Sequence, residues 1–312
     1  MTSASAPGKV ILFGEHAVVY GRPAIAIPVT QVRATASITP LPEEDQGQIY
    51  IEAPDIDFSS WMHETSRDHP LRQVIRLSLD AMQQKEFPAL RIRIKSSIPI
   101  AAGLGSSAAI SVAIIRVLGK YFNQSLPASQ QSDIAFQVEK IQHGSASGID
   151  NTVVAFEQPV IFTKGEVPQP FQPGAVINLL IADTGIASKT SQTVSQVKKK
   201  RAAETAYVES IFDQIAELTE LAKRAIISGQ IMVVGPLMNQ SHVLLQALGV
   251  SSPELDLLVQ AARDAGAFGS KLSGAGQGGN MIALATEDKL MTISEALTKS
   301  GASQVIQTRV EG

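Results

Sequence analysis

Residues 90–122 read LRIRIKSSIPIAAGLGSSAAISVAIIRVLGKYF, and they place a strand, a glycine-serine loop and a helix in direct succession. Residues 90–95 alternate apolar and basic side chains, which predicts a strand with one solvated face. Residues 107–122 are apolar nearly all round, which is typical of a buried helix. The loop Gly103-Leu104-Gly105-Ser106-Ser107 opens that helix, so we expect its backbone N–H groups at the positive end of a helix dipole.

This first glycine loop has the features of a phosphate-binding site, because unpaired N–H groups at a helix start bind phosphate oxygens. Ser106 and Ser107 add hydroxyls that can bind phosphate or magnesium. A Walker A loop would end in Gly-Lys-Ser/Thr, and no lysine is present here. Gly103-x-Gly105-x-x-Ala108 fits the relaxed dinucleotide fingerprint, but no acidic residue follows at the expected place. A serine-capped helix start without a ligand is the open alternative.

A second glycine cluster, residues 274–279, holds four glycines in six positions and follows Lys271 and Ser273. Glycines lose much conformational freedom on folding, so a plain turn rarely needs four of them. A flexible hairpin loop is the alternative interpretation. Two such loops in one chain favour a polyphosphate ligand more strongly than either loop does by itself.

The rest of the chain mixes short strands with helices. Further strands are predicted at residues 9–13, 24–29, 32–38, 48–52, 152–156, 160–163, 176–182 and 280–285, and a last strand closes the chain. Helices are predicted at residues 69–85, 133–143 and 253–264, with two or three between 191 and 249 and one before the last strand. Residues 165–174 are the candidate linker. This order favours an α+β fold over a doubly wound parallel sheet.

The composition limits the classes of function. The chain has 312 residues, a formal net charge of −3 and no cysteine, so it offers neither a global basic field for nucleic acid nor disulfides or thiolate metal sites. The basic run at residues 198–201 is interpreted as a solvated helix face. No segment has about 20 uninterrupted apolar residues, and the first residues do not resemble a signal peptide. We expect a cytoplasmic protein with a small-molecule substrate and no nucleic-acid or membrane partner, while a homodimer is left open.

Five charged or titratable residues are candidates for phosphoryl-transfer chemistry, which needs cations, a magnesium ligand and a group that orients the attacking hydroxyl. Glu139 and Asp150 are offset from neighbouring apolar positions. Lys9, Glu15 and His16 flank an otherwise apolar strand. Plainer alternatives are a solvated helix face for Glu139, a cap or turn for Asp150 and a structural histidine for His16.

Four segments resemble the mevalonate kinase family, which is part of the galactokinase–homoserine kinase–mevalonate kinase–phosphomevalonate kinase superfamily. Residues 6–21, APGKVILFGEHAVVYG, resemble the first family motif, and residues 99–109, PIAAGLGSSAA, resemble the second. Residues 271–279, KLSGAGQGG, resemble the third, and residues 143–151, HGSASGIDN, resemble the family segment His-Gly-x-x-Ser-Gly-x-Asp-Asn. Galactokinases usually follow Gly-Glu-His with Thr-Asp-Tyr, where this chain has Ala-Val-Val.

The resemblance implies ATP-dependent phosphorylation of the 5-hydroxyl of (R)-mevalonate, with Mg²⁺ as the second cofactor. Asp150 matches the catalytic base of the family, and Lys9 matches the lysine near the phosphates and the attacking hydroxyl. Glu139 and Ser107 match the magnesium ligands. The ATP-binding residues that the resemblance implies are Ser96, Ala101, Ala102, Gly103, Leu104, Gly105, Ser106, Ser107, Gly274 and Gly276. The substrate-binding residues that it implies are Glu15, His16 and Thr190.

Two residues depart from the family pattern. Gln277 replaces a glycine that is usual in the third motif, so its side chain is expected to narrow the loop or to add a hydrogen bond. Ser188 stands where animal relatives carry a basic residue, and Lys189 is the candidate substitute for holding the substrate carboxylate. Rival functions are phosphorylation of phosphomevalonate or of a sugar by a related kinase, and nucleotide binding without catalysis.

The fold that the resemblance implies is α+β with two domains. The N-terminal domain is expected to be like ribosomal protein S5 domain 2 and the C-terminal domain ferredoxin-like, with the active site in the cleft between them. We expect residues 1–172 to bind the ATP phosphates and residues 173–312 to carry the second glycine-rich loop.

Overall fold

The computed structural model describes residues 1–99, 103–143, 148–188 and 190–311, and the chain divides into two compact units. Unit 1 comprises Met1–Gly8, Val32–Pro99 and Gly105–Glu157, and unit 2 comprises Lys9–Gln31, Ile100–Leu104 and Gln158–Gly312. Strands β1 (Thr2–Phe13) and β2 (Ala24–Pro40) each contribute residues to both units. The predicted domain boundary between residues 172 and 173 and the predicted cleft stay predictions.

Unit 1 is built on a sheet in which β5 (Leu90–Ser96) lies between β2 and β3 (Ile49–Ala53). β5 is antiparallel to β2 and parallel to β3, and β4 (Phe58–Trp61), which the sequence did not predict, is antiparallel to β3. The alternation in β5 is as predicted: the apolar positions are buried and the basic positions are exposed. One face of this sheet is therefore apolar, and it requires a cover of helices.

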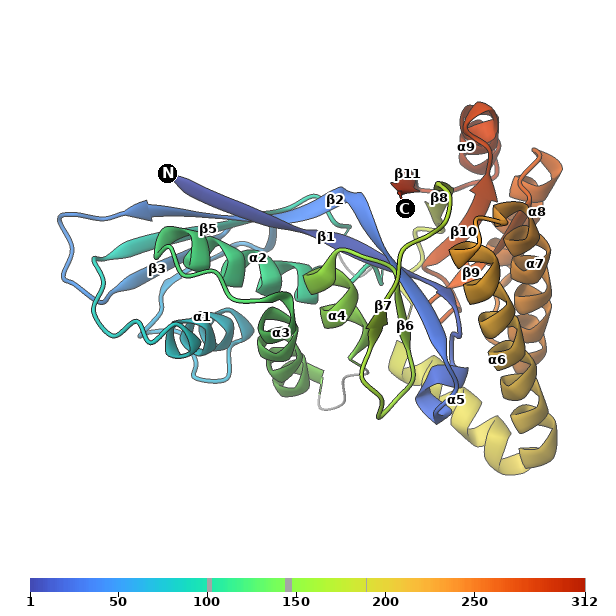
Figure 1. Ribbon diagram of the computed structural model, residues 1–312, viewed down its shortest axis with the longest axis horizontal. Coiled ribbons are helices and arrows are strands. Elements are labelled where there is room, and N and C mark those ends of the chain that lie inside the picture. Colours follow the sequence, from blue (N-terminus) through green and yellow to red (C-terminus); the bar gives the residue numbers. More distant parts are fainter. Residues whose placement is uncertain (100–102, 144–147, 189, 312) are drawn as a thin grey trace. The chain divides into compact units, whose positions relative to one another are not determined.

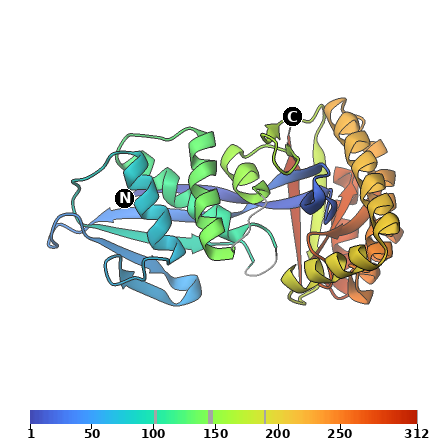
Figure 2. The same ribbon diagram turned by 90° about the horizontal axis from the view of Figure 1, so that it is seen from below.

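Four helices cover that apolar face, as Figures 1 and 2 show. They are α1 (Pro70–Ala81), α2 (Ser106–Tyr121), α3 (Ala128–His143) and α4 (Ile149–Phe156). The predicted helix at residues 107–122 is confirmed as α2, and most of its residues are buried on all sides. On α3, Ile134 and Val138 are buried as expected, but Ile141 is 46% exposed, so the predicted apolar face ends before it.

Helix α4 contradicts the strand predicted at residues 152–156. The run Thr152-Val153-Val154 has the β-branched side chains that favour a strand. Packing against α2 and α3 outweighs this propensity, because α4 buries all three side chains there as a helix. Gly148 begins the helix at a φ of 87°, and the Thr152 hydroxyl donates to the Gly148 carbonyl at 2.7 Å.

Unit 2 contains a four-stranded antiparallel sheet in the order β11-β8-β10-β9. Its strands are β8 (Ile177–Asp183), β9 (Gly269–Ser273), β10 (Asn280–Ala285) and β11 (Gln304–Val310). The helices of this unit are α5 (Thr190–Ala203), α6 (Thr205–Ile227), α7 (Ile231–Leu248), α8 (Pro253–Asp264) and α9 (Leu290–Lys299). Phe212, Leu245 and Met281 belong to the core between helices and sheet, beside which α6 and α7 lie in Figure 1.

The same unit includes the first half of β2, which pairs with β6 (Val160–Phe162), and β6 pairs with β7 (Gln169–Pro170). The sequence predicted two strands at residues 24–29 and 32–38, but β2 is continuous over both. Of the described residues, no helix is both long enough and apolar enough to span a membrane.

One buried histidine joins three elements of unit 2. His242 on α7 accepts a hydrogen bond at Nδ1 from the Leu272 N–H of β9, at 3.3 Å. The neutral ring therefore carries its proton on Nε2, which donates to Asp256 of α8 at 3.1 Å. Burial lowers the pKa of His242 to about 4, although the nearby Asp256 carboxylate acts in the opposite direction. The histidine thus serves as a neutral connector between helices and sheet.

We predict that unit 2 loses stability between pH 7 and pH 5 because of His242. The folded-state pKa lies below the ordinary value of 6.5, so the unfolded chain binds the proton first as the pH falls. The loss from this group is roughly 2 kcal/mol over that interval. Urea unfolding followed by circular dichroism at both pH values measures it, and the same experiment on His242→Gln is the control. A pH dependence that is equal in the variant would contradict this assignment.

Candidate active site

The first glycine loop leads into α2 as the sequence predicts. Gly105 is the N-cap residue, with a φ of 73°, and Gly103 also has a positive φ of 72°. Because the N-cap residue is a glycine, it makes no side-chain cap hydrogen bond, and a serine does not occupy that position. Ser106 and Ser107 occupy the first turn of α2 and are half-buried. A helix N-terminus with two hydroxyls and no protein carboxylate in its first turn is suited to an anion.

The other candidate residues near the first glycine loop differ in their location and in their hydrogen bonds. Leu104 is buried, and its carbonyl accepts a hydrogen bond from the Lys9 N–H of β1 at 2.9 Å. The structure thereby brings Lys9, whose side chain is buried, to the first glycine loop. Ser96 lies at the end of β5, where its hydroxyl accepts from the Ile98 N–H at 3.1 Å. Ala101 and Ala102 lie outside the described residues.

The two candidate carboxylates of unit 1 lie on neighbouring helices. Glu139 on α3 is only 7% exposed, so it is not the solvated side chain that the plainer alternative assumed. Asp150 is half-buried in the first turn of α4, where a negative charge is favoured by the helix dipole. Beside it, the Asn151 amide donates to the Ser132 hydroxyl at 2.8 Å and to the Ser132 carbonyl at 3.1 Å. Asn151 therefore ties the start of α4 to α3.

A buried ion pair lies among the candidate site residues of unit 2. The Lys271 ammonium of β9 donates to the Glu15 carboxylate and, at 2.8 Å, to the Leu272 carbonyl, and neither charged side chain is exposed. Burial raises the pKa of Glu15, and the adjacent Lys271 opposes that rise. Burial also lowers the pKa of Lys271, which Glu15 opposes. The sequence analysis named Lys271 as a neighbour of the glycine cluster and as the first residue of the third motif, but it gave this lysine no role in a buried ion pair.

His16 lies next to this ion pair in the chain and reaches the second glycine loop. Its Nε2 is 2.9 Å from the Ala275 carbonyl, to which it donates as the protonated ring nitrogen. The residue is buried and has a φ of 61°, which is uncommon for a side chain with a Cβ. Burial lowers the pKa of His16, so the ring is neutral at neutral pH. The first motif therefore holds the third motif through two side chains, Glu15 and His16.

The second glycine loop is fixed at several backbone positions. Gly274 and Gly276 have φ values of 90° and 80°, and a Cβ on Gly276 would lie 2.0 Å from the Val250 carbonyl oxygen. The Ser188 hydroxyl donates to the Gly276 carbonyl at 2.7 Å. The Gly279 N–H donates to the Ile186 carbonyl at 2.8 Å. The loop is thus a held structure, and the flexible-hairpin alternative does not describe it.

Gln277, which stands in place of a glycine usual in the family, adds hydrogen bonds, one of the two expected effects. Its side-chain amide donates to the Gly249 carbonyl at 3.0 Å and to the Ser251 carbonyl at 2.9 Å, while its N–H donates to Val250 at 2.8 Å. The side chain bridges the loop to the connection between α7 and α8. Its φ of 56° is a backbone strain that these three hydrogen bonds compensate. Thr190, by contrast, is exposed at the start of α5, and Lys189 lies outside the described residues.

Comparison with known proteins identifies both halves of the chain. Residues 71–158 match the GHMP kinases N terminal domain, and residues 222–303 match the GHMP kinases C terminal domain. Mevalonate kinase from Pyrococcus abyssi is 36% identical over 98% of this chain and 95% of its own length. Mevalonate kinase from Pyrococcus horikoshii is 38% identical over 90% and 88%.

A solved structure agrees with these relatives. The crystal structure of L. major mevalonate kinase in complex with R-mevalonate superposes with a TM-score of 0.84 at 27% identity, covering 100% of this chain and 96% of the other. The fold and both matched domains define a GHMP kinase, an ATP-using enzyme class, and confirm the two-domain α+β prediction. Within that class, the chain belongs to the mevalonate kinase family.

We predict that Gln277→Ala loosens the second glycine loop. The variant loses two side-chain hydrogen bonds and keeps the positive φ, so local opening should become about tenfold more frequent. Amide hydrogen exchange at Gln277 and Gly279 measures this, because both N–H groups are hydrogen-bonded. The control is Gln240→Ala on the exposed surface of α7. Equal exchange in both variants would show that Gln277 does not hold the loop.

Proposed function

We propose that the protein transfers the γ-phosphoryl group of ATP to the 5-hydroxyl of (R)-mevalonate, giving 5-phosphomevalonate and ADP. The observation that carries this proposal is the start of α2, where the glycine loop leaves a helix N-terminus for phosphate with Ser107 in the first turn. Full-length similarity to mevalonate kinases supports the choice of the acceptor. The relative that was solved with R-mevalonate supports the stereochemistry of the substrate.

The transfer assigns a task to each candidate catalytic residue. The bond between the γ-phosphorus and the bridging oxygen breaks as the 5-oxygen of mevalonate forms its bond to that phosphorus. Asp150 accepts or steers the proton of the attacking hydroxyl, and the ammonium group of Lys9 offsets negative charge on the transferring group. The electron pair of the broken bond leaves with ADP. The protein therefore contributes mainly position and electrostatics, as is usual for phosphoryl transfer.

The ATP-binding and magnesium residues fit a hard cation bound to phosphates. Mg²⁺ is commonly held by one or two carboxylates together with substrate phosphates and water. Glu139 supplies a buried carboxylate, and Ser107 supplies a hydroxyl at the helix end that we assign to the phosphates. When bound, the ion would neutralise charge on the phosphate oxygens. Ser96, Gly103, Leu104, Gly105, Ser106, Gly274 and Gly276 are assigned to ATP by family resemblance.

The acceptor site is assigned to the first motif. We infer that His16 faces mevalonate and that its hydrogen bond to the Ala275 carbonyl fixes its position. We assign Glu15, which is ion-paired with Lys271, to the same acceptor site. Thr190 is exposed at the start of α5 and is available to a ligand. Ser188 donates to the second glycine loop, so its hydroxyl proton is not available to hold the substrate carboxylate. The cytoplasmic location and the homodimer stay predictions.

A substrate panel tests the proposed acceptor. We expect ADP release with ATP, Mg²⁺ and (R)-mevalonate, and little release with phosphomevalonate, galactose or homoserine. Identification of the product as 5-phosphomevalonate by ³¹P NMR would complete the assignment. Turnover of phosphomevalonate or a sugar in place of mevalonate would favour a related kinase. ATP binding without turnover on any of the four compounds would favour a non-enzymatic role.

We predict that Asp150→Asn lowers kcat by at least about 10²-fold while ATP binding is retained, because the variant keeps the shape of the side chain and loses its proton acceptor. Steady-state ADP release gives kcat, and calorimetric titration gives the ATP affinity. The matched control is Asp80→Asn on the exposed surface of α1. Near-normal turnover in Asp150→Asn would exclude Asp150 as the base.

A further inference from the structure

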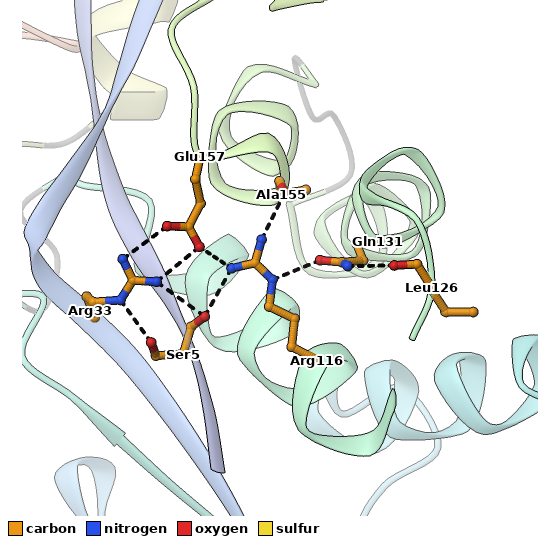
Figure 3. Close-up of polar contacts among 7 residues, drawn as sticks. All are labelled: Ser5, Arg33, Arg116, Leu126, Gln131, Ala155 and Glu157. Carbon is orange, nitrogen blue, oxygen red and sulfur yellow. Dashed lines mark hydrogen bonds and ion pairs between the residues drawn. The ribbon is translucent and has the colours of Figure 1, made fainter. Parts of the chain in front are cut away.

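Two arginines and one glutamate, none of which is assigned to a ligand, form a polar cluster in unit 1 (Figure 3). We call Arg33, Arg116 and Glu157 the arginine–glutamate cluster. Arg33 of β2 donates to both carboxylate oxygens of Glu157, at 3.1 and 3.0 Å. Arg116 of α2 donates to the same carboxylate, and Figure 3 shows the two guanidinium groups on either side of it. The partners come from three separate parts of the chain.

Arg116 connects its own helix with three other elements. Its Nη2 donates to the Ala155 carbonyl near the end of α4 at 2.9 Å, and its Nε donates to the Gln131 side chain of α3 at 2.9 Å. Its Nη1 donates to the Ser5 carbonyl of β1 at 3.0 Å. A planar guanidinium can satisfy several acceptors in fixed directions, which an ammonium group cannot do. The position of α4 relative to α2 is therefore set by a rigid group.

Glu157 is locally unfavourable where it stands. It is the C-cap of α4 with a φ of 50°, a conformation that costs a residue with a Cβ roughly 1 kcal/mol or more. Its negative charge also lies at the negative end of the helix dipole. Burial acts to raise the pKa of Glu157, but the hydrogen bonds from Arg33 and Arg116 outweigh it and hold that pKa below the usual range. The two arginines therefore stabilise the ionised glutamate at this position, whereas its own helix does not.

The helices that the cluster joins begin with residues assigned to catalysis. Ser107 lies one residue into α2, about 14 Å along the helix from Arg116, and Asp150 lies one residue into α4. Asn151 and Ser132 already fix the start of α4 to α3. The cluster fixes the other end, at Ala155 and Glu157. Side-chain hydrogen bonds therefore hold the start of α4 to α3 and the end of α4 to α2, which restricts movement of α4.

We propose that Arg116 and Glu157 are positioning residues for phosphoryl transfer, which hold Asp150 on α4 in a fixed place relative to Ser107 on α2. This inference rests on the proposed function of those two residues. Neither Arg116 nor Glu157 needs to touch a ligand for this role. A displacement of about 1 Å in a reacting group can cost on the order of 10²-fold in rate. The effect of losing the cluster should therefore appear in the rate of transfer more than in ATP binding.

The test uses Arg116→Gln and Glu157→Gln in the full chain. We expect kcat to fall by about 10- to 100-fold in each variant, while KM for ATP stays within about twofold because the start of α2 is unchanged. The control is Val74→Ala, which removes buried volume from α1, a helix without candidate site residues. A kcat in either cluster variant no lower than in Val74→Ala at matched stability would overturn the proposal. Equal changes in kcat and KM would overturn it as well.

A second measurement on the ligand-free protein separates this inference from the proposed function. Amide hydrogen exchange of residues 149–156 should be faster in Arg116→Gln and Glu157→Gln than in Val74→Ala, whatever the substrate is. Unchanged exchange there would overturn the positioning role even if mevalonate is the substrate. Faster exchange, with a kcat loss on another member of the substrate panel, would keep the role and reject mevalonate.

Discussion

The second unit depends on the buried ion pair between Lys271 and Glu15. Two charges without solvent exposure are costly unless each has a partner, and loss of one partner from such a pair typically costs about 3–5 kcal/mol. The pair joins the turn after β1 to strand β9, so the first and third motifs of the family form one structure here. Lys271 lies two residues before the end of β9, so the pair holds the strand close to the start of the second glycine loop.

The loop that follows β9 shows how the chain offsets the entropy of its glycines. Glycines permit the positive φ values and close approaches of the loop, but they also give the unfolded chain more freedom to lose. His16, Ser188 and Gln277 each donate to a backbone carbonyl in or beside the loop, and they come from three different segments. Two of these three are positions where the chain departs from its family pattern. The departures therefore act on the same loop, one from within it and one from the segment before α5.

Sequence alone predicted those parts of the fold and site that depend on local patterns. The alternation of β5, the apolar helix α2 and the glycine loops were all visible as periodicity or composition. Helix α4 was predicted to be a strand because its residues are β-branched, but packing against α2 and α3 outweighs their strand propensity. The cluster around Glu157 was invisible, since Arg116 and Arg33 are 41 and 124 residues away from it in the chain. Lys271 was undervalued because no local pattern distinguishes a buried lysine from a solvated one.

Helices α2 and α4 begin with the same backbone geometry but differ in the side chain at their second residue. Both helices begin at a glycine N-cap in the left-handed region, and a glycine has no side chain with which to cap the helix. The second residue of α2 is Ser107, so the positive end of that helix has hydroxyl and N–H groups for an external anion. The second residue of α4 is Asp150, so that helix end carries its own carboxylate. The proposed roles of the two helix ends follow this difference: an external phosphate at the start of α2 and a proton acceptor at the start of α4.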